Sequence, residues 1–341
     1  MKALVIKEIG QAAFCDVSAP RPKKSEVLLD VRHVGLCGSD LNTFRGANPL
    51  SALPRIPGHE IGGVILETGA GVPKEFAKGA AVIVVPYSTC GECAACRNGR
   101  ENACKYNQTL GVQVDGGMST QIAVRFDRLI QNDQLPAAHL ALVEPLSVGF
   151  HAVARGRVGP KDTVAVLGGG MIGVGAMLGA IAAGARVIAI EVSEEKREPL
   201  MALGVDRVVN PLAENLEETL LSLTEGRGPD VVIEAVGLSE TFRAAVDLVS
   251  FAGRIVYVGY AKSEVSYNTS LFNLKELDIM GSRNATRVDF EAVIAFLTGR
   301  AALANSLISK VFAWSEADQA FEYWEKNRNT TFKVMIDLKD E

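Results

Sequence analysis

Four of the six cysteines in this 341-residue chain lie close together, with the spacing Cys90-x2-Cys93-x2-Cys96-x7-Cys104. Four thiolates spaced in this way can surround one tetrahedral Zn²⁺ and leave no coordination position open for water or substrate. The spacing therefore predicts a structural zinc site that does not carry the reaction. A pair of disulfides or a redox CxxC pair is the alternative interpretation, which the cytosolic character of the rest of the chain disfavours.

A glycine-rich segment, Gly168-Gly169-Gly170-Met171-Ile172-Gly173, matches the pattern GxGxxG. It follows the apolar run Thr163–Leu167 and opens a predicted helix, which is the context that dinucleotide binding needs. The first glycine permits a tight turn, the second lets the backbone approach a pyrophosphate, and the third allows close packing of helix on strand. Amide groups at the helix N-terminus would then bind the phosphates.

Glu191 stands at the end of the next predicted strand. A carboxylate there accepts hydrogen bonds from the adenosine ribose hydroxyls and repels a 2′-phosphate, so we expect NAD to be preferred over NADP. Arg197 lies close enough in the sequence to keep NADP as an alternative, and Glu191 as a solvated surface charge is the other interpretation. The expected cofactor-binding residues are Gly168, Gly170, Met171, Ile172, Gly173, Glu191, Arg197, Ala235, Val236, Val258 and Gly259.

Three separated segments offer ligands for a second metal ion. They are Gly35-Leu36-Cys37-Gly38-Ser39-Asp40, Pro57-Gly58-His59-Glu60 and Val143-Glu144-Pro145-Leu146-Ser147. A thiolate, an imidazole and a carboxylate would give a catalytic zinc three protein ligands and one open position. An alcohol bound there is acidified and can release a hydride to a nicotinamide. Taken singly, Cys37, His59 and Glu144 each have a structural explanation, but their occurrence beside the other two motifs favours a metal site.

The elements that must position these residues change in type along the chain. Up to about residue 147 the sequence reads as short β segments between turns. From Pro145 onwards strands alternate with helices at a spacing typical of right-handed βαβ units and a parallel sheet. After about residue 284, two helices and a strand over Phe332–Leu338 follow. We therefore expect an α/β protein of two domains, the second with a doubly wound parallel sheet.

Composition excludes several classes of partner. The net charge is −5, 48% of the residues are hydrophobic and 22% are charged, and no long basic run occurs. Nucleic acid and anionic membrane surfaces are therefore not expected partners. The N-terminus becomes polar too soon for a signal peptide, and the apolar stretch Val164–Ile190 is broken by glycines and Arg186. We expect a cytoplasmic protein.

Taken together, these motifs resemble the zinc-containing medium-chain dehydrogenase/reductase family, and within it the sorbitol dehydrogenase-like polyol dehydrogenases. The resemblance covers essentially the whole chain, and includes Glu144-Pro145-Leu146-Ser147-Val148. It implies a GroES-like β domain over residues 1–148 and 285–341 that carries two zinc sites. It also implies a Rossmann-fold NAD-binding domain over residues 149–284.

The resemblance also implies roles for the candidate ligands. Cys37 and His59 correspond to catalytic zinc ligands, and Glu60 and Glu144 are both candidates for the carboxylate ligand, directly or through water. The choice between the two carboxylates stays open. Glu191 stands where the family usually has aspartate, which should lengthen its reach by one methylene and leave the preference for NAD intact.

Further roles implied by the resemblance concern protons and substrate. Ser39 corresponds to the hydroxyl that passes the substrate proton toward solvent, and Asp40 to a carboxylate that hydrogen-bonds His59 and fixes its tautomer. Ser39, Glu144, Arg283 and Asn284 are the candidate substrate contacts, the last two for hydroxyls or a carboxylate. A structural ion pair of Arg283 with an acidic neighbour is the alternative.

The function that the resemblance implies is reversible oxidation of a secondary alcohol of a polyol or sugar acid, of the sorbitol, galactitol, galactonate or gulonate kind, with NAD and two Zn²⁺ per chain. A threonine 3-dehydrogenase or a butanediol or other secondary alcohol dehydrogenase is the alternative within the enzymes. A catalytically silent nucleotide-binding scaffold is the alternative outside them. The resemblance suggests a homodimer or homotetramer joined through the edge of the Rossmann sheet, with Glu264–Ile279 as the contact region.

Overall fold

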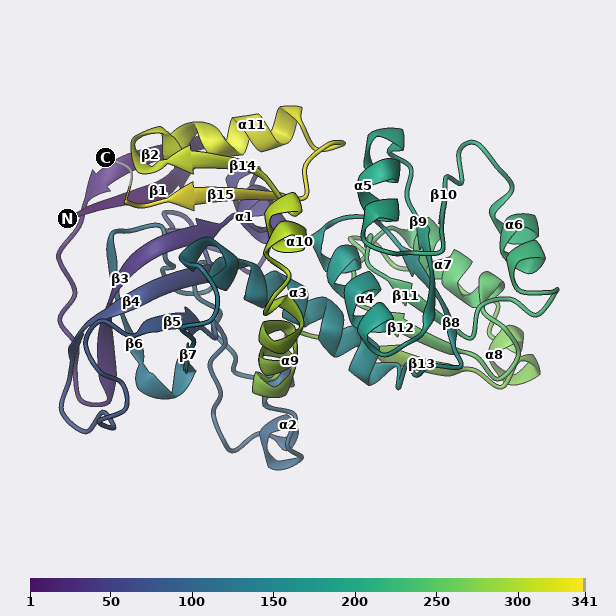
Figure 1. Ribbon diagram of the computed structural model, residues 1–341, viewed down its shortest axis with the longest axis horizontal. Helices are drawn as coiled ribbons and strands as arrows, with labels where there is room; N and C mark the ends of the chain where they lie inside the picture. The colour runs from purple at the N-terminus through teal and green to yellow at the C-terminus, as the bar shows by residue number, and fades with distance from the viewer. Residues whose placement is uncertain (340–341) are drawn as a thin grey trace. The chain divides into compact units, whose positions relative to one another are not determined.

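The structure is a computed structural model that describes residues 1–339 (Figure 1). The chain divides into two compact units, one of Met1–Glu144 with Leu297–Glu341 and one of Pro145–Phe296. The first transition lies close to the domain boundary predicted after residue 148. The second lies between Phe296 and Leu297, at the last residue of helix α9 (Arg287–Leu297), whereas the predicted boundary at residue 284 precedes that helix.

The first unit is built mainly of antiparallel strands. Its seven-stranded sheet has the order β14-β15-β3-β4-β5-β7, with β6 paired to β3, and β1 and β2 form a separate hairpin. Buried aliphatic side chains of β3 and β4, among them Leu29, Ile61 and Ile65, form its core. The strands are β1 (Lys2–Glu8), β2 (Gln11–Asp16), β3 (Glu26–Gly35), β4 (Glu60–Thr68), β5 (Ala81–Val84), β6 (Gln121–Arg125), β7 (Leu129–Gln131), β14 (Ile308–Ala313) and β15 (Lys333–Asp337); the helices are α1 (Gly38–Phe44), α2 (Ala94–Arg97), α10 (Ala301–Ser306) and α11 (Ala320–Lys326).

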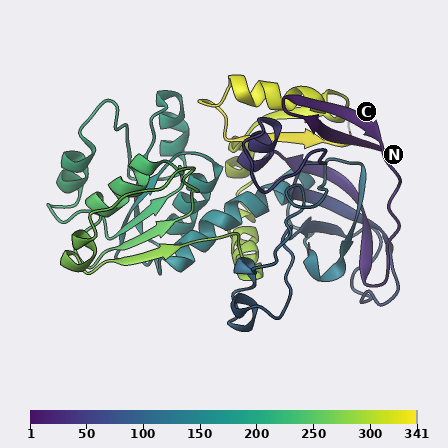
Figure 2. The ribbon, with the colours of Figure 1, turned by 180° about the vertical axis from the view of Figure 1, so that it is seen from behind.

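The second unit is a six-stranded parallel sheet with the order β10-β9-β8-β11-β12-β13 (Figure 2). Its central strands are nearly continuous runs of buried aliphatic residues, as expected when helices cover both faces of a sheet. The strands are β8 (Thr163–Leu167), β9 (Arg186–Ile190), β10 (Arg207–Val209), β11 (Val231–Glu234), β12 (Arg254–Tyr257) and β13 (Asp278–Gly281); the helices are α4 (Met171–Ala182), α5 (Arg197–Ala202), α6 (Leu216–Leu223), α7 (Ser239–Leu248), α8 (Ser270–Leu274) and α9.

The strand order of the second unit confirms the predicted doubly wound sheet. Strand β8 pairs in parallel with β9 on one side and with β11 on the other. The order of the strands therefore reverses beside β8, and ligands of open α/β sheets bind at the carboxyl ends of the strands where this reversal occurs. Gly168 follows the carboxyl end of β8, so the fold places the glycine-rich turn at that point.

Helix α3 (Ala137–Arg155) runs from the first unit into the second. By length and composition alone it is apolar enough to span a membrane, but 78% of the relevant window is buried inside the protein. It also holds Glu144 and, directly after it, Pro145. We therefore interpret α3 as a core helix.

Helix α9 is tied to the second half of α3 by a buried polar contact. His151 Nδ1 lies 2.9 Å from Asp289 Oδ2, which also accepts hydrogen bonds from the Thr286 N–H (2.7 Å) and hydroxyl (2.6 Å). The rings of Phe150 and Phe296 pack edge to face nearby. Although burial opposes ionisation, the hydrogen bonds from His151 and Thr286 hold the pKa of Asp289 below its usual value.

Asp289→Asn is therefore expected to lower the free energy of unfolding by about 1–3 kcal/mol near neutral pH. Because the folded-state pKa of Asp289 is depressed, its contribution is present above the unfolded pKa and is lost as pH falls through the folded value. The difference between the proteins should shrink below about pH 4. Urea unfolding of both proteins across pH measures it, with the exposed Asp133→Asn as control. A difference that does not change with pH would assign the effect to packing.

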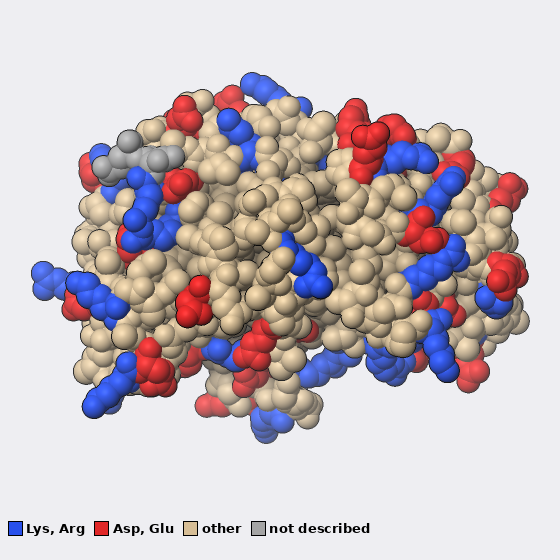
Figure 3. Space-filling model, viewed as in Figure 1, with Lys and Arg blue, Asp and Glu red and all other residues tan. Residues whose placement is uncertain are grey.

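Acidic and basic side chains are interspersed on the face of the molecule shown in Figure 3. This distribution agrees with the mildly negative net charge of −5. A protein surface that binds nucleic acid mainly through phosphates carries a continuous basic patch instead. The described residues on the face shown form no such continuous patch.

Candidate active site

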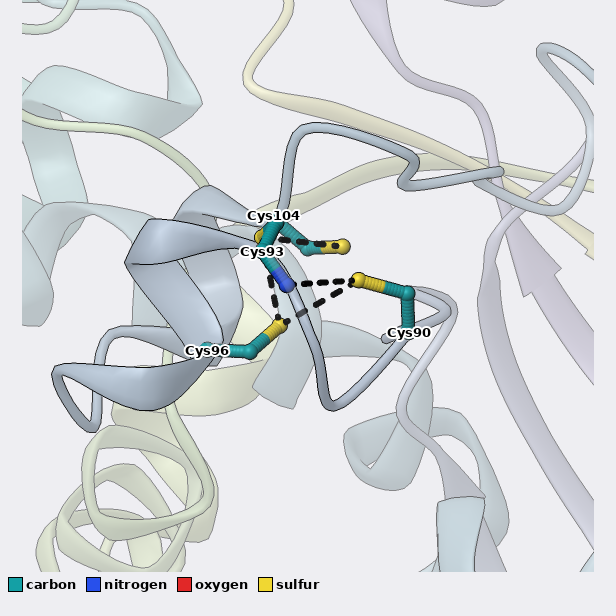
Figure 4. Close-up of side chains that lie close together, drawn as sticks. All are labelled: Cys90, Cys93, Cys96 and Cys104. Atoms are coloured by element: carbon teal, nitrogen blue, oxygen red, sulfur yellow. Dashed lines mark hydrogen bonds between the residues drawn. The ribbon is translucent and has the colours of Figure 1, made fainter.

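The four clustered cysteines, Cys90, Cys93, Cys96 and Cys104, point their sulfurs toward one another (Figure 4). The separations of sulfur atoms are 3.6 Å for Cys93 and Cys96 and 3.9 Å both for Cys90 with Cys96 and for Cys93 with Cys104. Four sulfurs at about 2.3 Å from one zinc would lie about 3.8 Å apart, whereas a disulfide needs about 2.05 Å. The geometry of this cysteine cluster therefore suits a tetrahedral ion.

The local backbone of the cysteine cluster favours thiolates. Amide groups of Cys96 and Lys105 lower the pKa of the Cys93 thiol to about 6. Burial and the neighbouring sulfurs raise the pKa of Cys96 to about 11, because crowded thiolates repel one another. A dication is the group that would let all four ionise together.

A second cluster joins Cys37, His59 and Glu60, whose ligand atoms all lie within 4.8 Å of one another. Cys37 precedes the first turn of α1, and His59 and Glu60 stand at the start of β4. Glu60 pairs with Gly35 across β3 and β4, and a Cβ atom on Gly35 would stand 2.0 Å from Glu60 Oε2. Gly35 is thus required for the carboxylate to occupy this place. We call these three residues the reactive cluster.

The reactive cluster concentrates negative charge around an imidazole. Burial alone would lower the pKa of His59, yet the charges of Cys37, Asp40 and Glu144 raise it well above its usual value. The His59 Nδ1 atom is buried and has no hydrogen-bond partner. An unpartnered buried nitrogen among a thiol and carboxylates is the environment expected of a cation site.

Asp40 holds the two ligand-bearing segments together through their backbones. Its Oδ2 atom accepts a hydrogen bond from the Cys37 N–H (2.9 Å) and its Oδ1 atom one from the Gly58 N–H (3.1 Å). The distance from Asp40 Oδ1 to His59 Nδ1 is 3.9 Å, which is too long for the expected hydrogen bond. In this structure Asp40 therefore acts on the ring through its charge and fixes the segments that carry Cys37 and His59.

Lys333, which the motifs did not point to, contacts the carboxylate of Glu60. Its Nζ atom lies 2.6 Å from Glu60 Oε1 and 2.5 Å from Oε2, and it also donates to the Leu36 carbonyl at 2.9 Å. Both side chains are buried. Burial still raises the pKa of Glu60 although Lys333 opposes the shift. A single lysine among the apolar residues of β15 is the signal that could have revealed this partner.

Glu144 has a partner of a different kind. The buried phenol of Tyr87 donates a hydrogen bond to Glu144 Oε1, and the charge of Glu144 contributes to the raised pKa of His59 and of Glu60. Glu144 therefore lies beside the reactive cluster without belonging to the compact set of three. Ser39 is the second residue of α1, and its hydroxyl oxygen is buried without a hydrogen-bond partner.

The glycine-rich turn of the second unit has the conformation that its residues require. Gly168 has φ +102°, and a Cβ atom on Gly173 would stand 1.8 Å from the Gly168 carbonyl oxygen. A Cβ on Gly168 would stand 2.9 Å from Val236, which follows β11. The amides of Val258 and Gly259, after β12, both donate to the Glu234 carbonyl (2.9 and 3.1 Å). The expected cofactor residues after β8, β11 and β12 are therefore neighbours in space.

Glu191 is held over the glycine-rich turn by two backbone groups. Its Oε2 atom accepts from the Gly169 N–H (2.7 Å) and its Oε1 atom from the Ser193 N–H (2.8 Å). A Cβ atom on Gly169 would stand 2.6 Å from Oε2, so the longer glutamate fits because residue 169 is glycine. Arg197 lies on α5 and pairs with Glu194 at 3.4 Å.

The candidate substrate contacts Arg283 and Asn284 follow β13 in the second unit. Asn284 has φ +52°, a left-handed conformation that asparagine tolerates better than most residues. The fold therefore makes residue 284 the point where the chain turns from the last strand of this sheet toward α9.

Comparison with known proteins decides the family. Residues 23–136 match the family model of the alcohol dehydrogenase GroES-like domain, and residues 172–299 match that of the zinc-binding dehydrogenases. An uncharacterized zinc-type alcohol dehydrogenase-like protein of Haemophilus influenzae is 35% identical over 317 residues, which are 93% of this chain and 92% of the relative. The chain belongs to the zinc-type alcohol dehydrogenase family. The resemblance inferred from the motifs, and the GroES-like and Rossmann fold that it implied, are confirmed.

Other members of the zinc-type alcohol dehydrogenases are also similar over nearly their whole length. The L-galactonate-5-dehydrogenase of Escherichia coli is 31% identical over 98% of both chains, and a sorbitol dehydrogenase of Halalkalibacterium halodurans is 32% identical over 94% and 95%. Among solved structures, RspB of E. coli with NADH has a TM-score of 0.92 at 28% identity, covering 99% of both chains. A zinc-binding dehydrogenase of Sinorhizobium meliloti bound to NADP has a TM-score of 0.88 at 28% identity, with 99% of both chains covered.

Proposed function

We propose that this zinc-type alcohol dehydrogenase oxidises a secondary alcohol of a polyol or sugar acid to the ketone, with NAD⁺ as the hydride acceptor. The observation that carries the proposal is the buried reactive cluster beside the unpartnered hydroxyl of Ser39. The relatives named for galactonate and sorbitol support the substrate class. We assign the catalytic role to the first unit and NAD binding to the second.

The donor atoms fit a catalytic metal ion. A thiolate, an imidazole and a carboxylate within 4.8 Å of one another match the three-ligand zinc sites of enzymes. Zinc, when bound, supplies a Lewis acid that lowers the pKa of the substrate alcohol. Cys37, His59 and Glu60 would hold it, since Glu60 belongs to the compact set. The cysteine cluster would hold a second, structural zinc.

The chain's own residues account for the proton and the substrate. The alcohol O–H proton passes to Ser39 Oγ and on to solvent, while a hydride leaves the carbon that bears this hydroxyl for NAD⁺, which gives a ketone and NADH. Glu144, held by the Tyr87 phenol, accepts a hydrogen bond from a substrate hydroxyl. Arg283 and Asn284 are the candidate contacts for further hydroxyls or a carboxylate.

A substrate panel tests this function. The zinc-loaded protein is assayed for NADH formation with polyols, aldonic acids, threonine, butanediol and simple secondary alcohols. We expect the highest kcat/KM with a polyol or an aldonic acid. Preference for threonine or butanediol would establish the alternative dehydrogenases. NADH binding without turnover of any substrate would indicate a silent nucleotide-binding scaffold.

The environment of Glu191 supports NAD over NADP. Its carboxylate is anchored over the turn by the amides of Gly169 and Ser193, where it would meet the ribose hydroxyls and repel a 2′-phosphate. Glu194 and Glu195 follow on the same segment, where Arg197 pairs with Glu194. NADP used at least as well as NAD would overturn the assignment.

Gly169→Ala is expected to weaken NADH binding by about 10–100-fold, because the new methyl group displaces Glu191 and hydrogen bonds to a charged group contribute about 1.5–3 kcal/mol. Fluorescence titration with NADH and NADPH measures both affinities. The double variant Gly169→Ala with Glu191→Asp should recover NADH affinity, since the shorter carboxylate leaves room for the methyl group. An unchanged affinity in the single variant would show that the carboxylate does not contact the cofactor.

We propose that two chains associate through β13, the edge strand of the parallel sheet. Ile279 of β13 and Leu274 of α8 expose 40% and 65% of their surface, and both lie within the contact region expected from the sequence. An exposed strand edge with apolar side chains favours pairing with another strand. Light scattering of the purified protein distinguishes a dimer or tetramer from a monomer.

The composition supports a cytoplasmic location.

A further inference from the structure

One buried phenol in the candidate active site has no counterpart among the motifs. Tyr87 is 7% exposed and Glu144 is 4% exposed, and the tyrosine hydroxyl donates a hydrogen bond to Glu144 Oε1. Any metal ion or substrate hydroxyl that approaches Oε1 must compete with this bond. The phenol therefore restricts what Glu144 can contact.

We propose that Tyr87 is a positioning residue that fixes Glu144 beside the reactive cluster and keeps this carboxylate out of the metal's ligand set. The inference rests on the proposed function, because it takes Cys37, His59 and Glu60 to hold the metal. It adds a residue that sets the roles of the two carboxylates.

The backbone around Tyr87 is held in place on both sides. Hydrogen bonds join residues 85–88 to the segment 107–110 and to Arg128, whose guanidinium donates to the Val85 and Pro86 carbonyls, and together they close the loop that carries the cysteine cluster. Further bonds run from Val85 N to Arg128 O (2.7 Å), from Leu110 N to Pro86 O (3.1 Å), from Ser88 N to Asn107 Oδ1 (3.0 Å) and from Gln108 N to Ser88 Oγ (2.7 Å). The phenol thus reaches Glu144 from a fixed backbone, so little conformational freedom is lost when the bond forms.

Glu144 needs such a partner because of its place in α3. The next residue is Pro145, which has no N–H to donate to the helix and so weakens this turn. A glutamate side chain has several rotatable bonds, and without the Tyr87 bond the Glu144 carboxylate could reach the cation that Glu60 would hold. A hydroxyl bond restrains the rotamer without neutralising the charge.

The two carboxylates, Glu60 and Glu144, therefore differ in the kind of side chain that they contact. Glu60 contacts the ammonium group of Lys333, a full positive charge, and Glu144 contacts a neutral phenol. The Lys333 ammonium group offsets the charge of Glu60. The Glu60 carboxylate nevertheless lies within 4.8 Å of the thiol and imidazole ligand atoms. Glu144 is tethered by the Tyr87 hydroxyl and lies outside that compact set of ligand atoms. This division assigns metal binding to the first and substrate binding to the second.

Cobalt spectroscopy of Tyr87→Phe tests the inference. Zinc is replaced by Co²⁺ in the wild type and the variant, and the spectrum of Cys37→Ser is subtracted to isolate the reactive cluster from the cysteine cluster. We expect a wild-type spectrum of four-coordinate cobalt, and weaker d–d absorption in Tyr87→Phe as Glu144 enters as a further ligand. We also expect kcat to fall by about 10–100-fold, as is typical when a residue that orients a site is lost.

Two further variants make the result specific. Tyr106→Phe removes an exposed phenol next to the cysteine cluster and should change neither spectrum nor kcat. Tyr87→Phe with Glu144→Gln should restore the wild-type spectrum, because an amide is a weaker ligand than a carboxylate. A Tyr87→Phe spectrum identical to that of the wild type, with only a lower Tm, would overturn the role of Tyr87. A wild type with no Cys37-dependent cobalt spectrum would overturn the metal site itself.

Discussion

Replacing Cys37 by serine is expected to lower kcat/KM by about 10³-fold, while NADH binding and the unfolding transition stay close to those of the wild type. Cys37 supplies the thiolate of the reactive cluster, and a catalytic metal ion contributes several kcal/mol of transition-state stabilisation, each 1.4 kcal/mol of which is about tenfold in rate. The side chain is half-buried at the start of α1, so the loss of packing is small. Steady-state kinetics, NADH titration and urea unfolding measure these three effects, and metal analysis counts the bound ions.

The matched control for Cys37→Ser is Cys15→Ser, which changes a half-buried cysteine on β2 outside both clusters. The control should keep its activity and both metal ions, whereas Cys37→Ser should lose one of the two. Full activity of Cys37→Ser would contradict the mechanism. Loss of NADH binding or of cooperative unfolding would show that Cys37 has a structural role instead.

Lys333→Met is expected to lower the free energy of unfolding by about 3–5 kcal/mol. The ammonium group and the Glu60 carboxylate are both almost fully buried, so removal of the cation leaves a carboxylate without a compensating charge. The variant also loses the hydrogen bond to the Leu36 carbonyl, next to Cys37. Urea unfolding measures the effect.

Two comparisons separate the charge effect from packing. Lys310→Met, on the neighbouring strand β14 with an exposed side chain, should change stability by much less. The double variant Lys333→Met with Glu60→Gln should recover part of the loss, because the amide no longer needs a cation. If the double variant were as unstable as the sum of the two single variants, the Lys333–Glu60 pair would not be the cause.

The two carboxylates of the candidate active site show where sequence reasoning ends. The pattern of residues identified Glu60 and Glu144 as alternatives and offered no physical reason to choose. The choice depends on their partners, Lys333 and Tyr87, which lie 273 and 57 residues away along the chain. Neither partner belongs to a motif, because its role follows from where its backbone is placed by β15 and by the segment after β5.

What the sequence determined by itself was local chemistry. The spacing of four cysteines, the glycines of the GxGxxG turn and the alternation of strands and helices each express a constraint between near neighbours in the chain, and such constraints can be read directly. Tertiary structure decided the long-range contacts: Gly35 makes room for Glu60, Gly169 for Glu191, and Asp40 binds the backbones of two ligand segments instead of the imidazole. These contacts depend on strand register and on burial. The pattern of neighbouring residues in the sequence does not show which distant side chains will pack together in the interior.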